Sequence, residues 1–181
     1  MMKFEELDIK GAYLITLEPF EDERGSFSRQ FCKKEFAKLG IDFDICQCNI
    51  STNKKRGTIR GMHYQKAPYL EYKLVSCVKG SVYDVIVDLR EDSPTCLKWC
   101  GVELSETNNK QILIPPMVAH GFQTLEDDST IFYQLGEFFY SEYYDGVRYD
   151  DPAFGIEWKN IKPFIMSEKD QKYELIKKYE T

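Results

Sequence analysis

Histidine is scarce in this chain, with only two among 181 residues, at positions 63 and 120. A metal centre built from three or four imidazole ligands is therefore excluded. Four of the six cysteines form two close pairs, Cys46-Gln-Cys48 and Cys96-Leu-Lys-Trp-Cys100, and neither has the spacing of a zinc finger or knuckle. We expect no structural metal, and we expect these cysteines to act as small buried hydrophobic residues in strands.

An excess of positive charge is also missing, because 24 Lys+Arg stand against 30 Asp+Glu and the net charge is −6. This balance argues against nonspecific binding to nucleic acid or to an anionic membrane, since both need a basic footprint. Any anionic ligand must be held by a few local cations. Four of the six arginines lie in the first third of the chain: Arg24, Arg29, Arg56 and Arg60.

Long hydrophobic runs are absent as well. The longest apolar stretch, ILIPPMVA at 112–119, is too short to span a bilayer. The N-terminal MMKFEELDIKG lacks the apolar core of a secretory signal. We therefore expect a cytoplasmic protein with free thiols and no membrane partner. Because no repeat or linker interrupts the chain, residues 1–181 are expected to form a single domain.

Strand patterns dominate what is present. Short runs rich in β-branched, aromatic and other apolar residues lie at 13–17, 74–78, 81–89, 111–114 and 130–135. Within the run 81–89, strict alternation places Tyr83, Val85, Val87 and Leu89 on one apolar face. Many short strands predict an antiparallel sandwich or barrel. No GxGxxG motif and no regular alternation of strand and helix are found, which argues against a Rossmann sheet.

Two short helices are expected beside the strands. One covers 33–39 and ends at Gly40, a suitable residue for the position after a helix. The other begins at Ser167-Glu-Lys-Asp170, a capping box with Ser at the N-cap and an acidic residue at N3. Helical spacing of Tyr173, Ile176 and Tyr179 predicts that this second helix continues toward the end of the chain.

Both histidines lie in segments that resemble the two motifs of the cupins. These segments are GTIRGMHYQ, at 57–65, and PPMVAHGF, at 115–122. Metal-binding cupins carry a second histidine where this chain has Gln65, so the set of donors suits iron or manganese poorly. We therefore expect a metal-free barrel, and a metal-dependent dioxygenase is disfavoured.

Several ordered segments extend this resemblance over almost the whole chain. They are RGMHYQ at 60–65, DVIVDLR at 84–90, SPT at 93–95, PPMVAHGF at 115–122, DDP at 150–152, IEW at 156–158 and SEKD at 167–170. Together they resemble the dTDP-4-dehydrorhamnose 3,5-epimerase family. The resemblance implies an all-β double-stranded β-helix (a cupin, or jelly roll) with short flanking helices, a cofactor-free isomerase and a homodimer. It implies epimerisation at C3 and C5, or at C3 alone, of a nucleotide-linked 4-keto sugar for surface polysaccharide biosynthesis.

Epimerisation next to a ketone needs a base, an acid on the opposite face of the ring and a donor for the enolate oxygen. The resemblance implies that His63 is the base and that Asp170 orients it. It implies that Tyr133 is the acid and that Lys73 lies near the developing oxyanion. Simpler alternatives stay open: Asp170 could only cap its helix, Tyr133 could belong to the core, and Lys73 could be solvated. Asp84 is a rival partner for His63.

A nucleotide diphosphate needs arginine, lysine and polar contacts. The positions that match the family's substrate contacts are Arg24, Gln47, Asn49, Arg60 and His120. Strict alternation along a strand would place Arg60 and His63 on opposite faces. A β-bulge at Gly61 would bring both to one site.

Three departures from the family pattern concern the substrate. Arg29 and Tyr144 stand where the family has substrate-contact glutamates, and Met117 replaces the glycine of a Pro-Pro-Gly turn. Arg29 and Tyr144 are therefore candidate substrate contacts, and the substrate is a dTDP-4-keto-6-deoxyhexose or a GDP-4-keto-heptose. The alternatives are a ketoisomerase of such sugars and a non-catalytic sugar-nucleotide-binding cupin. Retention of Lys73 and of the segment 167–170 favours the epimerase.

Overall fold

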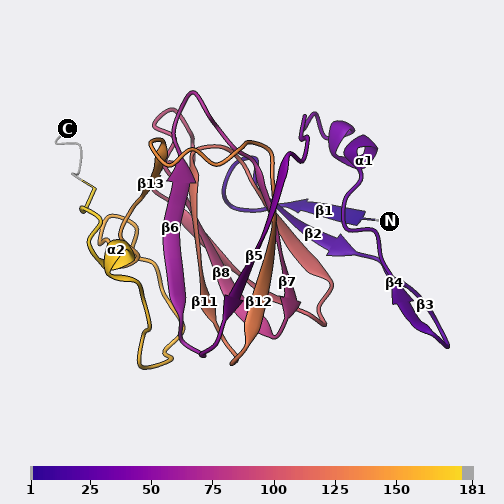
Figure 1. The fold of residues 1–181 in the computed structure, drawn as a ribbon. Helices are drawn as coiled ribbons and strands as arrows, with labels where there is room; N and C mark the ends of the chain where they lie inside the picture. Colours follow the sequence, from indigo (N-terminus) through magenta and orange to yellow (C-terminus); the bar gives the residue numbers. More distant parts are fainter. Residues whose placement is uncertain (1, 177–181) are drawn as a thin grey trace.

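The computed structural model describes residues 2–176, and within them two antiparallel sheets pack face to face (Figure 1). In spatial order, the larger sheet contains β1 (Met2–Glu6), β2 (Tyr13–Leu17), β10 (Lys110–Ile114), β7 (Lys73–Lys79), β12 (Ser129–Leu135) and β5 (Gln47–Asn53). The smaller sheet contains β13 (Tyr144–Gly146), β6 (Ile59–Gln65), β11 (Val118–Thr124), β8 (Ser81–Asp88) and β9 (Trp99–Ser105). The predicted all-β jelly roll is confirmed.

The main core lies between the two sheets. Ile112 and Ile131 from the larger sheet meet Val82, Ile86 and Phe122 from the smaller one, and none of these side chains is more than 1% exposed. Burying each of them contributes roughly 1.5–3 kcal/mol relative to an exposed position. The core occupies part of the space between the sheets and leaves room beside it for a cavity.

Strand β8 was predicted to be apolar on one face, but both of its faces are buried. Val82 and Ile86 point into the main core, whereas Val85 and Val87 belong to a second cluster with Phe154. Alternation therefore separated the two faces correctly. It missed the burial of the second face because a segment distant in sequence, from Val147 onward, covers it.

The first expected helix is present as α1 (Lys33–Ala37), and Gly40 follows it with a φ of +73°. The second is α2 (Glu168–Gln171), where the Ser167 hydroxyl accepts a hydrogen bond from the Asp170 backbone N–H at 3.1 Å. The predicted continuation of α2 is wrong for the described residues. Instead, the Ile176 N–H donates to the Asp151 carboxylate at 2.6 Å, so a long-range contact replaces a helical hydrogen bond. Tyr179 lies outside the described residues.

The cysteines only partly follow the prediction. All six are free thiols, and Cys77 is buried, which raises the pKa of its thiol to about 11. Cys48, on the edge strand β5, and Cys46, just before that strand, are exposed, contrary to expectation. Among residues 2–176, no group of three or more His, Cys, Asp or Glu side chains could hold a metal ion. No described helix has the length and apolar character needed to cross a membrane.

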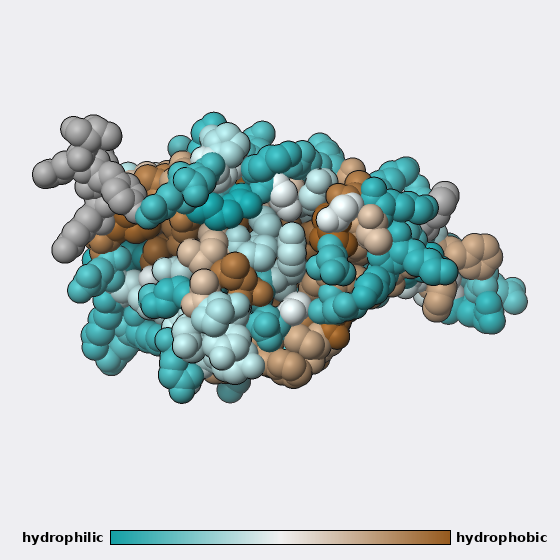
Figure 2. Space-filling model, turned by 90° about the horizontal axis from the view of Figure 1, so that it is seen from above, coloured by the Kyte–Doolittle hydropathy of each residue, from teal (hydrophilic) through white to brown (hydrophobic). Residues whose placement is uncertain are grey.

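A two-stranded hairpin, β3 (Phe20–Asp22) and β4 (Gly25–Phe27), projects from the sandwich at the lower right of Figure 1. Phe20 and Phe27 pair with one another across it and are 68% and 78% exposed. Figure 2 shows the same projection on the right, with apolar side chains exposed beside charged ones. The hairpin therefore contributes little to the core of its own chain.

Candidate active site

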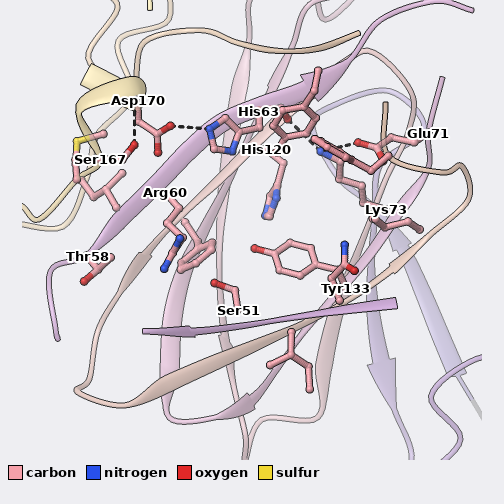
Figure 3. A pocket seen from close by; sticks show the side chains of 18 of the residues that line it. Ser51, Thr58, Arg60, His63, Glu71, Lys73, His120, Tyr133, Ser167 and Asp170 are labelled. Atoms are coloured by element: carbon pink, nitrogen blue, oxygen red, sulfur yellow. Dashed lines mark hydrogen bonds and ion pairs between the residues drawn. The ribbon is translucent and has the colours of Figure 1, made fainter. Parts of the chain in front are cut away.

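A cavity of about 620 Å³ opens between the two sheets at the side of the C-terminal segment (Figure 3). Its walls come from β5, β6, β7, β11, β12 and β13 and from residues 165–170. Eight of the eleven candidate residues line it: Asn49, Arg60, His63, Lys73, His120, Tyr133, Tyr144 and Asp170. Segments more than a hundred residues apart in the sequence thus supply one polar site.

Strand β6 delivers both Arg60 and His63 to the cavity through a β-bulge. His120 of β11 pairs with His63, and Phe122 pairs with Arg60, so β6 contains one extra residue between the two pairs. Gly61 lies in this bulge with a φ of +134°, a conformation that residues with a Cβ rarely adopt. The predicted bulge at Gly61 is confirmed.

His63 and Asp170 form a hydrogen-bonded pair, with 2.8 Å between His63 Nε2 and Asp170 Oδ1. Asp170 also accepts a hydrogen bond from the Gly61 N–H at 3.3 Å. Burial alone would raise the pKa of Asp170, but its bonds to His63, Gly61 and Ser167 outweigh this effect and lower it. The Ser167 hydroxyl caps α2 by accepting from the Asp170 backbone N–H, while Asp170 Oδ1 bonds to His63, so Asp170 does more than close the helix. An ionised carboxylate at this place stabilises a protonated imidazole.

Asp84 is paired with His120, so its alternative pairing with His63 is wrong. The distance from His120 Nε2 to Asp84 Oδ2 is 2.8 Å, and the two side chains are 4% and 0% exposed. Burial raises the pKa of Asp84, although the nearby His120 and Lys73 act in the opposite direction. The cavity therefore holds two separate His–Asp pairs.

Tyr133 lies on β12, in the sheet that faces the strand carrying His63. Figure 3 shows its hydroxyl group directed into the cavity, while its ring packs beside the main core and edge-on to His120 at 5.9 Å. Burial and the charge of Asp84 raise the pKa of Tyr133 well above its ordinary value of 10, against the effect of Arg60. The phenol is therefore protonated at neutral pH and can act as a proton donor.

Lys73 is buried at the first position of β7, so the alternative of a solvated lysine is wrong. Its Nζ lies 3.0 Å from Glu71 Oε1 and 3.2 Å from the backbone oxygen of His63. Sequence reasoning did not single out Glu71. The available signal was a carboxylate two residues before the lysine in an extended segment, where both side chains share a face.

Tyr144, on β13, supplies an aromatic wall beside His63. The ring centroids of Tyr144 and His63 are 5.3 Å apart, and Phe139 packs edge-on against Tyr144 at 5.1 Å. Tyr173, which sequence reasoning also missed as a site residue, lies edge-on to His63 at 6.0 Å. Burial, followed by the charge of Glu71, raises the pKa of Tyr144. Aromatic surface thus lies beside His63 at the position where the resemblance implied a substrate-contact glutamate.

Three candidate contacts do not line the cavity within a single chain. Arg24 is exposed at the tip of the hairpin and pairs with Asp22. Arg29 pairs with Glu35 of α1 at 2.9 Å. The hairpin carries Arg24 away from the sandwich, which no local pattern predicts (Figure 1). Gln47 lies beside the site, with its amide 3.3 Å from the Asn49 side-chain oxygen.

The geometry suits proton transfer at a carbon next to a carbonyl group. A carboxylate-supported imidazole lies on one wall and a protonated phenol on another, and the cations of Lys73 and Arg60 line the same cavity on opposite sides of the phenol. An imidazole can accept a proton near neutral pH, a phenol can return one, and a cation can stabilise the enolate between the two steps.

Comparisons with known proteins identify relatives of this chain. The sequence profile of the dTDP-4-dehydrorhamnose 3,5-epimerase family matches residues 6–178. A protein of this name from Sinorhizobium fredii is 41% identical over 169 residues, which cover 93% of this chain and 87% of that protein.

Two solved structures are similar to this chain in fold as well as in sequence. The dTDP-4-dehydrorhamnose 3,5-epimerase of Bacillus anthracis, crystallised with TDP and pyrophosphate, has a TM-score of 0.93 and 38% identity, covering 97% of this chain and all of that one. A dTDP-6-deoxy-D-glucose-3,5-epimerase from Legionella pneumophila, in complex with dTDP-4-keto-L-rhamnose, has a TM-score of 0.89 and 35% identity. The match covers 94% of this chain and 90% of the Legionella pneumophila chain.

Proposed function

The chain belongs to the dTDP-4-dehydrorhamnose 3,5-epimerase family of carbohydrate epimerases, and on this premise we propose that its cavity binds a dTDP-linked 4-keto-6-deoxyhexose and inverts C3 and C5 of the sugar. One observation carries the proposal: the His63–Asp170 pair faces the protonated Tyr133 across a cavity that also contains Lys73. The substrate assignment is supported by relatives whose structures hold TDP or a dTDP-sugar.

His63 takes the proton from the carbon next to the C4 carbonyl. The electron pair of the broken C–H bond moves into the carbonyl group and forms an enolate, and Asp170 stabilises the imidazolium that results. Lys73 lies within the same cavity and stabilises the enolate oxygen. Tyr133 then gives its proton to the carbon from the opposite face, which inverts the centre. Each acid–base group contributes roughly 10²–10⁴-fold to the rate.

The diphosphate is held near Arg60. The Arg60 Nε–H donates to the Asn53 side chain at 2.7 Å and anchors the guanidinium, and among residues 2–176 no hydrogen bond engages its terminal nitrogens, so these can hold a ligand. Asn49 and His120 line the same cavity and complete the polar contacts, with Gln47 beside Asn49. Tyr144 and Phe139 pack against the sugar or the base.

A homodimer fits the placement of the hairpin. Its two phenylalanines are largely exposed, and Arg24 at its tip is remote from the cavity of its own chain. Docking of the hairpin on a second copy would bury this apolar surface and bring Arg24 and Arg29 to the partner. The free thiols suit the cytoplasm, and residues 1–181 would act as one epimerase domain.

The decisive experiment follows hydrogen exchange in deuterated water. With a dTDP-4-keto-6-deoxyhexose, we expect deuterium at C3 and C5 of the sugar, detected by NMR or mass spectrometry. His63→Asn should abolish exchange at both carbons, because the amide cannot act as the base. Exchange at C3 alone would identify a 3-epimerase, and carbonyl migration a ketoisomerase. Binding without exchange would indicate a non-catalytic cupin, and preference for a GDP-4-keto-heptose would overturn the dTDP assignment.

Tyr133→Phe separates proton removal from inversion. The variant keeps the base, so we expect deuterium exchange with retention of configuration to persist while the inverted product falls by roughly 10²-fold or more. Product analysis by NMR measures both rates on one sample. Unchanged formation of the inverted product would show that Tyr133 is not the acid.

A further inference from the structure

Glu71 and Lys73 form a buried ion pair inside the wall of the cavity. Their side chains are 5% and 8% exposed, and 3.0 Å separates Lys73 Nζ from Glu71 Oε1. The contact is one of charges rather than an aligned hydrogen bond, since Glu71 Oε1 accepts no hydrogen bond from the described residues. A buried ammonium needs an opposite charge nearby, because leaving either partner alone in the interior is strongly unfavourable.

The second contact of the lysine ties it to the proposed base. Lys73 Nζ donates to the backbone oxygen of His63 at 3.2 Å. An ammonium has three N–H groups. Glu71 and the His63 backbone hold two sides of this ammonium. A remaining N–H can therefore face the cavity, which Glu71, His63 and Lys73 all line (Figure 3).

We propose that Glu71 is a positioning residue of the epimerase: it holds the Lys73 ammonium beside His63, at the place where negative charge develops on the sugar carbonyl oxygen. This inference rests on the proposed function. Glu71 acts through Lys73 and needs no contact with the reacting atoms. Its carboxylate also keeps a positive charge inside a wall otherwise rich in aromatic rings, such as that of Tyr144, 5.8 Å from Lys73 Nζ.

Substitutions at position 71 test the charge that holds Lys73. Glu71→Leu removes the carboxylate, so Lys73 can move, and we expect kcat for exchange to fall by about 10- to 100-fold with KM changed much less. Glu71→Gln keeps the shape of the side chain but removes its charge and should lose a similar share of the rate, whereas Glu71→Asp keeps the carboxylate and should retain more of it. A Glu71→Gln variant with the wild-type rate, or a loss confined to KM, would overturn the proposal.

A double-mutant cycle with Lys73→Met tests whether the effect passes through the lysine. Once Lys73 is absent, Glu71→Leu should lower the exchange rate by less than about twofold further. The same fold loss in both backgrounds would mean that Glu71 acts by another route and would overturn the proposal. Circular dichroism and melting temperature show that each variant is folded before its kinetics are compared.

A matched control uses an exposed ion pair between Glu103 of β9 and Lys159 of the C-terminal segment. Lys159 Nζ lies 2.8 Å from Glu103 Oε1, and the side chains are 42% and 58% exposed. Glu103→Leu should leave the exchange kinetics unchanged. The wild-type enzyme serves as the reference for function: no exchange by the wild type refutes the proposed function, whereas wild-type exchange with an unaffected Glu71→Leu refutes only the role of Glu71.

Discussion

At the scale of single residues, Gly61 decides whether the polar groups of β6 meet. Its φ of +134° belongs to the bulge that presents Arg60 and His63 to one cavity. A Cβ added here would lie 2.5 Å from the Gly121 Cα and 3.0 Å from the His120 backbone oxygen. Backbone approaches backbone at this point, so the contact cannot be relieved by a side-chain rotation.

Gly61→Ala should therefore lower the free energy of unfolding by about 2 kcal/mol or more and reduce deuterium exchange. Chemical denaturation and exchange kinetics measure the two effects. Gly40→Ala is the matched control, because Gly40 also has a positive φ, of +73°, but open space around its Cβ position. Similar stability losses and full activity in both variants would contradict the importance of the close approach.

At the scale of elements, the connection between β8 and β9 is organised by one buried carboxylate. Asp88, fully buried, accepts hydrogen bonds from Arg90, Ser93 and Thr95. Burial alone would raise its pKa, but these three partners outweigh burial and lower it to about 2 from an ordinary value of 3.8. Ionised Asp88 is thus favoured by the folded state.

This shift predicts a pH-dependent contribution to stability. Because the pKa is lower in the folded state, the contribution is complete above about pH 4 and is lost as the pH falls toward about 2. Asp88→Asn should cost about 2 kcal/mol at pH 7, and this cost should shrink between about pH 4 and pH 2. Urea denaturation of the wild type and of Asp88→Asn at several pH values measures this cost and its dependence on pH.

The control is Asp150→Asn, which removes an ion pair between side chains that are 33% and 40% exposed, Arg148 and Asp150. Its cost should stay below about 1 kcal/mol at every pH. A cost of Asp88→Asn that does not vary with pH would exclude the proposed linkage.

At the scale of the whole molecule, the hairpin projects from the sandwich (Figure 1), and the described residues leave the side chains of Phe20 and Phe27 mostly exposed. We expect Phe20→Ser combined with Phe27→Ser to weaken the dimer, because both side chains are mostly exposed and leave the core intact. Analytical ultracentrifugation should show a dimer for the wild type and a monomer for the double variant.

Val78→Ser is a suitable control, since Val78 is 49% exposed at the end of β7 and lies outside the hairpin. It should remain dimeric. A monomeric wild-type protein, or a double variant that associates as strongly as the wild type, would refute the role of the hairpin in association.

Much of the element structure could be predicted from local patterns. Alternation identified β8 and the residues that share each of its faces. The capping box at Ser167 marked the start of α2. These features depend on neighbours within a few residues, so the sequence contains their cause. The bulge at Gly61 was indicated differently, by the family resemblance, which places Arg60 and His63 at one site against strict alternation.

Other predictions failed where distant segments compete. The helix expected beyond α2 is replaced by the contact of Ile176 with Asp151, and Asp84 pairs with His120 rather than with His63. Exposure of Cys48 follows from the position of β5 at the edge of its sheet. Each outcome depends on which strand lies next to which, and no local pattern contains that information.

The sequence by itself determined the all-β class, the family and the residue types able to move a proton, because spacing and motif order are properties of the chain. Only the tertiary structure decided that Lys73 is held by Glu71 and that the His63 ring contacts both Tyr144 and Tyr173. It also decided that the hairpin carries Arg24 away from the cavity of its own chain. Burial and pairing are set by the packing of segments far apart in sequence, and they establish which of the candidate residues share one cavity.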